Sequence, residues 1–260
     1  MWDIIFDNYI LFLLTFTRMA GMLLFNPFLG KRNVPTIVKM GLSLFIALIT
    51  TPLINVQASY TELSSPFIFI ITILKEIFIG FSISFIMQMF ISLIFIAGEM
   101  IDLQIGIGMS KVYDPQSNIS MPLSGTIYHI IYILIFFSTN CHLTLISLIV
   151  RSCEVFPPGF EIINFGSASY IVYLFKDILV LALKLAVPII SIEILSEAGL
   201  GIIMKSVPQI NVFVVGLPLK LLIGLLLIIL LLPSTSRLLD VSTDFMFTDM
   251  EEFLSRMLSN

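Results

Sequence analysis

The sequence predicts an all-α, polytopic membrane-associated protein with about six long apolar helices. Two observations support this class. Hydrophobic residues make up 58% of the 260 residues and charged residues only 12%, whereas soluble domains contain about 45–50% apolar and about 25% charged residues. The apolar residues also gather into six segments, each near or above the roughly 20 residues that a spanning helix needs. These segments lie at 4–25, 37–56, 67–97, 123–150, 170–194 and 211–232.

The boundaries between the segments carry helix-start and turn residues. Ser65 and Pro66 suit the start of the third helix, because serine is a favoured N-cap and proline fits the first helical position. Residues 157–159, Pro-Pro-Gly, are expected to stop the fourth helix, and the glycines and proline between 199 and 208 are expected to separate the last two. Pro233 is expected to end the sixth helix.

The residues after the sixth helix differ in kind from the rest. We predict a multi-helix domain over 1–236 and an amphipathic tail over 237–260, in which Met246, Met250 and Phe253 recur at helical spacing between acidic residues. Two interpretations of this tail stay open. It either folds back on its own bundle or docks on another protein.

A polar break interrupts the apolar sequence between Ala97 and Pro122. It contains three glycines, two prolines and four charged residues. Backbone that is neither helix nor closed sheet cannot face hydrocarbon, because its N–H and C=O groups would lack hydrogen-bond partners. The break is therefore either a loop in water or a segment buried inside protein, where it lines a cavity.

Several charged residues lie inside the apolar segments, where a charge at the bilayer centre costs at least about 2.5–3.5 kcal/mol. Neighbours in sequence point in different directions on a helix, so a pair such as Lys75 and Glu76 needs partners on another helix or another chain. Three interpretations follow: a transport pathway for ions or protons, interface residues that fix register between subunits, or side chains near helix ends that reach the membrane surface. The last suits Arg18 and Lys220. The residues concerned are Arg18, Lys75, Glu76, Lys176, Asp177, Lys184, Glu193 and Lys220.

Motifs for catalysis, cofactors and nucleic acid are lacking in the sequence. Cys141 and Cys153 have no metal or redox spacing, and neither histidine has an acidic pair at ligand spacing. We therefore expect no enzyme, no cofactor, no metal site and no nucleic-acid partner. Glu99 and Asp102 lie three apart and could share a helical face. They are interpreted either as a carboxylate pair that titrates or binds a cation, or as the solvated start of the polar loop.

Motifs along nearly the whole chain resemble, in order, a family of known export proteins. The most specific stretch runs from Pro208 to Lys220, with Gln209, Asn211, Phe213, Gly216 and Pro218 between them. The others are Phe25–Gly30 with Val34 and Pro35, Ala97–Gly106 with Asp114 and Pro115, Phe137 with Asn140 and His142, and Pro188. They resemble the family of the flagellar export protein FliR and its injectisome counterparts, the T subunits of type III secretion. Cys141 and Lys205 depart from the glycine and the arginine that the family often has.

The resemblance implies a core subunit of the type III export gate, in the bacterial inner membrane at the basal body. Such a subunit assembles with P-type and Q-type subunits, and with a B-type or U-type switch subunit, into a pore that unfolded substrates cross. Flagellar and injectisome systems both fit. The alternative is a secondary transporter or ion channel in which Lys184, Glu193 or Glu99 binds an ion.

The resemblance further implies that the central loop, 106–120, is a plug of the closed pore; an ordinary external loop is the alternative. Glycine supplies backbone freedom, proline limits helix formation and methionine offers an adaptable seal. The expected plug residues are Gly106, Gly108, Met109, Ser110, Lys111, Tyr113, Asp114, Pro115, Ser117 and Asn118. The expected subunit-interface or helix-packing residues are Arg18, Lys75, Glu76, Lys184, Glu193, Pro208, Gln209, Asn211, Phe213, Gly216, Pro218 and Lys220. A plain turn between the fifth and sixth helices is the alternative for Asn211 to Pro218.

Overall fold

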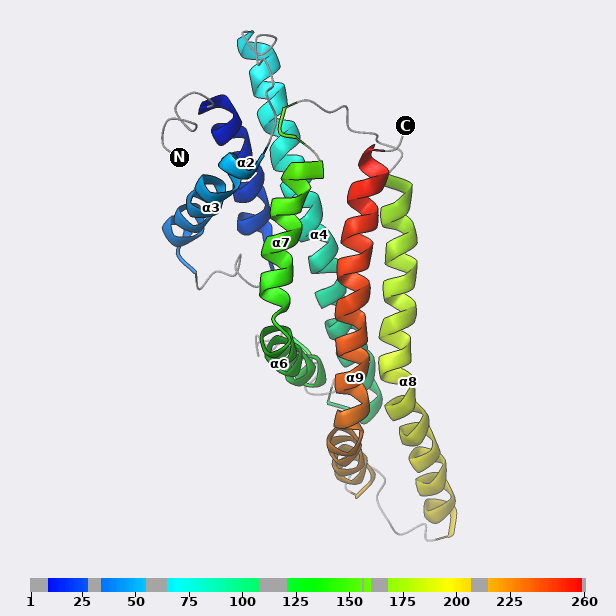
Figure 1. The fold of residues 1–260 in the computed structure, drawn as a ribbon. Helices are drawn as coiled ribbons and strands as arrows, with labels where there is room; N and C mark the ends of the chain where they lie inside the picture. The colour runs from blue at the N-terminus through cyan, green and yellow to red at the C-terminus, as the bar shows by residue number, and fades with distance from the viewer. Residues whose placement is uncertain are drawn as a thin grey trace. The chain divides into compact units, whose positions relative to one another are not determined.

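The computed structural model describes residues 9–27, 34–54, 65–107, 121–155, 157–159, 168–206 and 215–258, and these residues form helices with no strand (Figure 1). The all-α prediction is confirmed. The elements are α2 (Tyr9–Phe25), α3 (Thr36–Thr50), the 3-10 turn η1 (Thr51–Leu53), α4 (Pro66–Ile105), α6 (Leu123–Ser138), α7 (Cys141–Val155), α8 (Ala168–Ser206) and α9 (Leu217–Leu258).

Four of the described helical stretches are long and apolar enough to cross a membrane. They are Thr36–Leu53, Pro66–Ile105, Ser169–Ile203 and Leu217–Met257. α6 and α7 together make a fifth if the pair crosses as one broken span, while α2, with 17 residues, is apolar but shorter. A polytopic membrane protein is therefore the class to which this fold belongs.

The predicted fourth helix, 123–150, is two helices in the structure. α6 and α7 meet at an angle of 68°, because Asn140 between them has a φ of 58°. Asparagine tolerates this left-handed conformation better than most residues. The carbonyl of Asn140 then accepts hydrogen bonds from the backbone N–H groups of Leu143 and Thr144, at 2.9 and 3.3 Å, and begins α7.

Three helices extend beyond their predicted ends. α4 continues through Glu99 and Asp102 to Ile105 and stops where Gly106 takes a φ of 97°. α8 continues past Gly199 to Ser206. α9 runs through Pro233 to Leu258, so the prediction that this proline ends the helix is wrong. A glycine inside a helix lowers its stability by only about 1 kcal/mol, and a proline by about 3 kcal/mol. In α9, the burial of residues after Pro233, such as Met246, offsets that loss.

The chain divides into two compact units. Unit 1 consists of Met1–Met89, Asn140–Leu174 and Phe245–Asn260, and unit 2 of Phe90–Thr139 and Phe175–Asp244. α4, α8 and α9 contribute residues to both. α9 is helical on either side of the predicted boundary between 236 and 237, and the division into a gate domain and a tail stays a prediction.

Unit 1 contains the first described helices and the end of α9. α2 and α3 lie side by side (Figure 1), and α2 packs so closely on α4 that a methyl group at Gly80 would lie 2.2 Å from the carbonyl oxygen of Arg18. At the end of α9, Met250 and Phe253 are almost fully buried, and the hydroxyl of Tyr170 donates to the Asp249 carboxylate at 3.1 Å. The tail therefore packs on its own chain.

Unit 2 contains a close contact between α4 and α6. A methyl group at Gly98 of α4 would lie 2.2 Å from the backbone nitrogen of Gly125 in α6. Phe95, one turn earlier on α4, stacks at a tilt on His129 with ring centroids 5.1 Å apart. On α9, Gly224 leaves room for the side chain of Ile105. Small residues thus let the backbones approach, as in membrane helix pairs.

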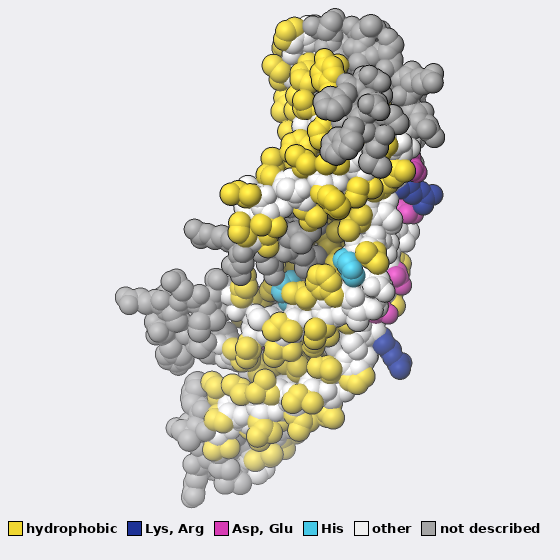
Figure 2. Space-filling view, turned by 60° about the vertical axis from the view of Figure 1, so that its left-hand side comes forward, with side chains coloured by type: hydrophobic (Ala, Val, Ile, Leu, Met, Phe, Trp, Pro, Cys, Tyr) yellow, Lys and Arg dark blue, Asp and Glu magenta, His cyan; other side chains and the backbone are white. Residues whose placement is uncertain are grey.

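Large apolar side chains cover much of the described surface. In Figure 2 they dominate the face in view, and charged side chains gather along one edge. Ile37 of α3, Leu195 of α8 and Ile229 of α9 are each at least 70% exposed. Continuous apolar surface on this scale is typical of contact with lipid or with other subunits.

Candidate functional site

A buried ion pair fixes the centre of unit 1. Arg18 on α2 donates from Nε to the Glu76 carboxylate on α4 at 2.6 Å, and the two side chains are 1% and 3% exposed. The Arg18 guanidinium also donates from Nη1 to the carbonyl of Ser152 on α7 at 2.9 Å, while the second carboxylate oxygen of Glu76 accepts from the backbone N–H of Gly159 at 3.0 Å. The prediction that Glu76 needs a partner on another helix is confirmed.

The pair joins three parts of the chain that are distant in sequence: α2, α4, and the end of α7 with Gly159 just after it. Arg18 is buried in this network, so the interpretation in which it reaches the membrane surface is wrong. Lys75 lines a cavity of about 10 Å³ beside the pair, together with Thr72 and Pro157. Arginine suits the position because its rigid fork of donors serves two acceptors at once.

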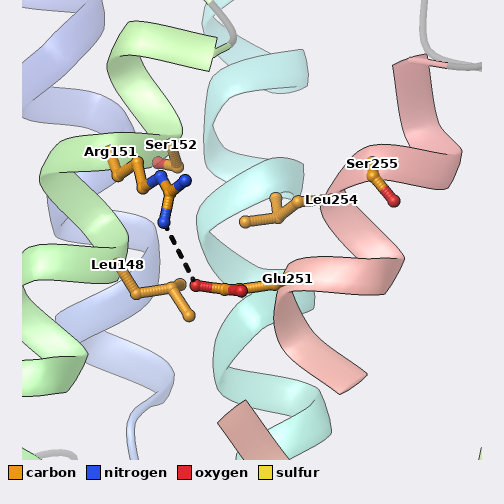
Figure 3. A pocket seen from close by; sticks show the side chains of 6 residues that line it. All are labelled: Leu148, Arg151, Ser152, Glu251, Leu254 and Ser255. Atoms are coloured by element: carbon orange, nitrogen blue, oxygen red, sulfur yellow. Dashed lines mark ion pairs between the residues drawn. The ribbon is translucent and has the colours of Figure 1, made fainter. Parts of the chain in front are cut away.

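A second, open pocket of about 210 Å³ lies between α7 and the end of α9 (Figure 3). Its lining residues are Leu148, Arg151, Ser152, Glu251, Leu254 and Ser255. Arg151 and Glu251 form an ion pair at 3.6 Å across it, but their side chains are 69% and 60% exposed. Exposed pairs contribute about 0–1 kcal/mol, so this one adds little to the stability of the packed tail. The sequence contained no signal for it, because the partners are 100 positions apart.

Asp102 in unit 2 caps a helix that begins 21 positions later. Its carboxylate accepts hydrogen bonds from the backbone N–H groups of Leu123 and Ser124, at 2.5 and 3.1 Å, and from the hydroxyl of Ser124. The first N–H groups of a helix have no partners within the helix, and a carboxylate there also interacts favourably with the helix dipole. Asp102 is 3% exposed, so the prediction of a solvated loop start is wrong for it. Its carboxylate binds this helix end, and Glu99 lies half-buried in α4.

The cap holds the two ends of the central loop together. α4 stops at Gly106, whose N–H donates to the carbonyl of Asp102 at 3.1 Å, and α6 starts on the carboxylate of the same residue. The contact of Gly98 with Gly125 lies one turn away. The structure thus places the start and the end of the loop at one point of unit 2.

We expect Asp102→Ala to destabilise the protein by about 1–2 kcal/mol, the usual cost of losing a helix cap. Asp102→Asn keeps one acceptor oxygen and should lose less. The measurement is the thermal unfolding midpoint of the purified protein in detergent. Asp240→Ala, at an exposed position of α9, is the control. Equal midpoints for Asp102→Ala and the control would show that the cap carries no stability.

A polar cluster joins α4, α8 and α9 within unit 2. The Glu197 carboxylate accepts from Lys220 Nζ at 3.0 Å and from Gln104 Nε2 at 3.3 Å. Lys220 therefore has a partner inside the chain. One turn before Glu197, Glu193 is fully buried; one carboxylate oxygen accepts weakly from Ser196 Oγ at 3.4 Å, and among the described residues the other has no hydrogen-bond partner.

The remaining predicted site residues are placed as follows. Lys184 is exposed on α8, Gly216 is buried in the π turn that precedes α9, and Pro218 is exposed in the first turn of α9, where proline is favoured. Of the ten expected plug residues, only Gly106 is described. Outside the described residues lie Gly108, Met109, Ser110, Lys111, Tyr113, Asp114, Pro115, Ser117, Asn118, Pro208, Gln209, Asn211 and Phe213.

Comparison with known proteins decides the family. The family model described as "Bacterial export proteins, family 1" matches residues 9–246. Flagellar biosynthetic protein FliR of Bacillus subtilis (strain 168) is 31% identical over 228 residues, which cover 86% of this chain and 87% of the relative. The chain belongs to the FliR family of bacterial export proteins. The family predicted from the motifs is confirmed.

Other FliR proteins match over a similar extent. FliR of Escherichia coli (strain K12) is 32% identical over 216 residues, covering 83% of this chain and 82% of the relative. FliR of Pectobacterium carotovorum is 28% identical over 263 residues, covering 99% and 96%. This chain thus spans nearly the full length of its FliR relatives, including both units.

The structure explains several residues of the FliR-like motifs. Asn26 is buried and donates from Nδ2 to the sulfur of Met87 at 3.5 Å. Gly98 lets α4 touch α6, Asp102 caps α6, and Asn140 turns the chain between α6 and α7. These residues hold the helices in place.

Proposed function

We propose that this chain is a core subunit of the flagellar export gate, in the bacterial inner membrane at the basal body. In this proposal it forms, with P-type and Q-type subunits and a B-type or U-type switch subunit, the pore through which unfolded substrates cross. The observation that carries the proposal is the match to FliR proteins along more than four fifths of the chain. The relatives are named flagellar, which favours a flagellar system over an injectisome. No cofactor, nucleic acid or catalytic step belongs to the proposal.

The distribution of polar groups supports an assembled protein over a solitary transporter. Arg18 pairs with Glu76 in unit 1, and Lys220 pairs with Glu197 in unit 2. These two pairs hold helices of the chain together. The large exposed apolar faces are then the surfaces that meet lipid and neighbouring subunits.

The proposal assigns the gate to residues 1–236 and a bracing role to the tail, 237–260. It also includes Pro208, Gln209, Asn211 and Phe213 as packing or interface residues beside Gly216 and Pro218. Met250 and Phe253 support the bracing role, because their burial ties the end of α9 to unit 1.

We further propose that the loop 106–120 is the plug of the closed pore. Support comes from its attachment, since Asp102 binds the start of α6 and holds both loop ends at one place. A loop fixed at its base can leave the pore without separating α4 from α6. Its glycines, methionines and small polar residues suit a wet, adaptable seal.

Deleting residues 108–118 is expected to make the assembled gate leak ions. Asp102, Gly106 and the start of α6 remain in this variant, so the helices keep their anchor. The measurement is the ion permeability of membranes that contain the full export complex. A variant with a Gly-Ser linker of equal length separates loss of the seal from shortening of the chain. Tight membranes and normal export in both variants would contradict the plug proposal.

Co-purification tests the assembly itself. The tagged full-length chain is extracted gently from membranes that also express the neighbouring export genes. We expect a stable complex with the P-type and Q-type subunits. A well-behaved chain that purifies alone and moves an ion across liposomes would overturn the proposal in favour of a transporter, with Glu193 as the first residue to test.

A further inference from the structure

Two carboxyl groups of unequal burial lie one turn apart on α8 in unit 2. Glu193 is 0% exposed, whereas the Glu197 side chain is 60% exposed. Residues four apart share one face of a helix, so the two carboxyl groups are neighbours, about 6 Å from each other along the helix axis. Lys220 of α9 binds Glu197 at 3.0 Å, and its positive charge also attracts the Glu193 carboxylate. One lysine thus lies beside two acceptors.

Lys220 is bound to the carboxylate that needs it less. Water stabilises an exposed carboxylate, and exposed ion pairs contribute little to stability. A buried carboxyl group needs hydrogen bonds and either a cation or a proton. Among the described residues, one oxygen of Glu193 accepts a weak bond from Ser196 Oγ at 3.4 Å and the other has no hydrogen-bond partner. Such unsatisfied buried atoms are rare in native proteins, so this one requires an explanation.

Lys220 is able to serve either carboxyl group. Its ammonium group is at the end of a flexible four-carbon chain and has three N–H donors. Rotation about the bonds of that chain moves the ammonium group by a distance comparable to one helical turn, about 5.4 Å. The Lys220 side chain is only 19% exposed, so binding to Glu193 requires little further loss of water. Attraction between the charges is also stronger where water is excluded.

A change of partner would reach the base of the central loop through Gln104. This residue of α4 lies two positions before Gly106, and its Nε2 donates to the same Glu197 carboxylate at 3.3 Å. While Lys220 binds Glu197, the carboxylate is a fixed acceptor for Gln104. When Lys220 moves to Glu193, Glu197 is free to turn into water and Gln104 loses that acceptor. One carboxylate therefore links the last turn of α4 to the first turn of α9.

We propose that Lys220 is an ion-pair switch, which binds Glu197 while the export gate is closed and Glu193 while it is open. In the closed state Gln104 is held, and the base of the loop 106–120 is fixed. In the open state Gln104 is released, and the loop leaves the pore. The role of the switch rests on the plug proposed above, whereas the two positions of Lys220 are a property of the chain itself.

Combined variants of the purified full-length protein test the two positions. Glu197→Gln weakens the first acceptor, so Lys220 is expected to bind Glu193. In that background Lys220→Met should lower the equilibrium constant for folding by about tenfold, as for other pairs in direct contact. With Glu193→Gln also present, Lys220→Met should have a much smaller effect, because neither carboxylate remains. The folding equilibrium is measured by titration with a denaturing detergent.

Lys184→Met is the matched control, because Lys184 is an exposed lysine of α8 itself. Its effect should add to that of Glu193→Gln in every background. If the effects of Lys220→Met and Glu193→Gln are also additive in the Glu197→Gln background, Lys220 has no second position and the inference is overturned.

A cryo-EM structure of the assembled gate that carries Glu197→Gln tests the second position without relying on stability. We expect Lys220 Nζ to lie within hydrogen-bond distance of a Glu193 carboxylate oxygen. A Lys220 side chain that turns into water would overturn the inference.

Secretion by cells tests the role of the switch. Glu193→Gln removes the second carboxylate, so Lys220 stays on Glu197. We expect most secretion of flagellar substrates to be lost, while the membrane stays tight and the P-type and Q-type subunits still co-purify. Normal secretion by this variant would overturn the role of the switch. If even the unaltered chain forms no complex with these subunits, the proposed function fails, and the folding measurements still decide whether Lys220 has two positions.

Discussion

Replacing Glu76 with leucine is expected to destabilise the protein by about 3–5 kcal/mol, the cost of leaving one charge of a buried pair without its partner. Arg18 would stay buried at 1% exposure, without the carboxylate that balances its charge, although the carbonyl of Ser152 still accepts from it. Arg18→Met should cost a similar amount, because Glu76 is then the stranded charge. The free energy of unfolding is measured by titrating the purified protein with a denaturing detergent.

The double variant distinguishes the charge from the packing. Arg18→Met with Glu76→Leu removes both charges and should recover much of the loss, as buried ion pairs replaced by apolar residues often do. A residual loss of about 1–3 kcal/mol is expected, because the carbonyl of Ser152 and the N–H of Gly159 lose their partners. Arg151→Ala at the exposed pair with Glu251 is the control and should change the stability by less than about 1 kcal/mol. If the double variant instead loses the sum of the two single-variant losses, the stranded charge is not the cause of the destabilisation.

Gly98→Ala is expected to lower stability by about 3 kcal/mol, the upper part of the usual range for overpacking. The new methyl group would lie 2.2 and 2.3 Å from the backbone nitrogen and Cα of Gly125. Backbone atoms cannot rotate away, so α4 and α6 must separate. The hydrogen bonds from Ser124 to Asp102 would then lengthen, and the central loop would lose its base. Ion permeability of the assembled gate should rise together with the loss of stability.

The same substitution at a glycine of α8 provides the control. Gly199 has no atom within 4 Å of the position where its methyl group would be. Gly199→Ala should therefore be neutral or stabilise the helix by up to about 1 kcal/mol, because alanine loses less backbone entropy on folding. The thermal midpoints of the two variants are compared in the same detergent. If Gly98→Ala behaves like Gly199→Ala, the two helices are further apart than the structure shows.

Long runs of apolar residues were enough to predict where helices exist, because such runs must satisfy their backbone hydrogen bonds internally. The ends of helices were harder to predict. Gly199 and Pro233 are local signals. A glycine costs a helix only about 1 kcal/mol, and Pro233 is outweighed by the burial of residues that follow it, such as Met246. Asn140 breaks a helix through the backbone angle of a single residue, and that angle leaves no trace in hydrophobic periodicity.

The candidate site shows the same limit. A carboxylate inside an apolar segment, such as Glu76, predicts that a partner exists. It does not predict that the partner is Arg18, 58 positions away. Asp102 caps a helix across 21 positions, whereas cap signals are recognised within the first turn of the helix they serve. The α8 charges were visible in the sequence, and only the structure shows that Asp177 and Lys184 face outward on one side.

The lengths of three helices bear on how membrane boundaries can be assigned. α4, α8 and α9 contain 40, 39 and 42 residues, so each is about 60 Å long at 1.5 Å per residue. The hydrocarbon layer is about 30 Å thick, and even a tilt of about 40°, the steepest usually seen, leaves roughly 20 Å of each helix outside it. The ends of these helices therefore do not mark where the chain enters and leaves the hydrocarbon layer. Membrane borders drawn at the helix ends would be several turns too wide.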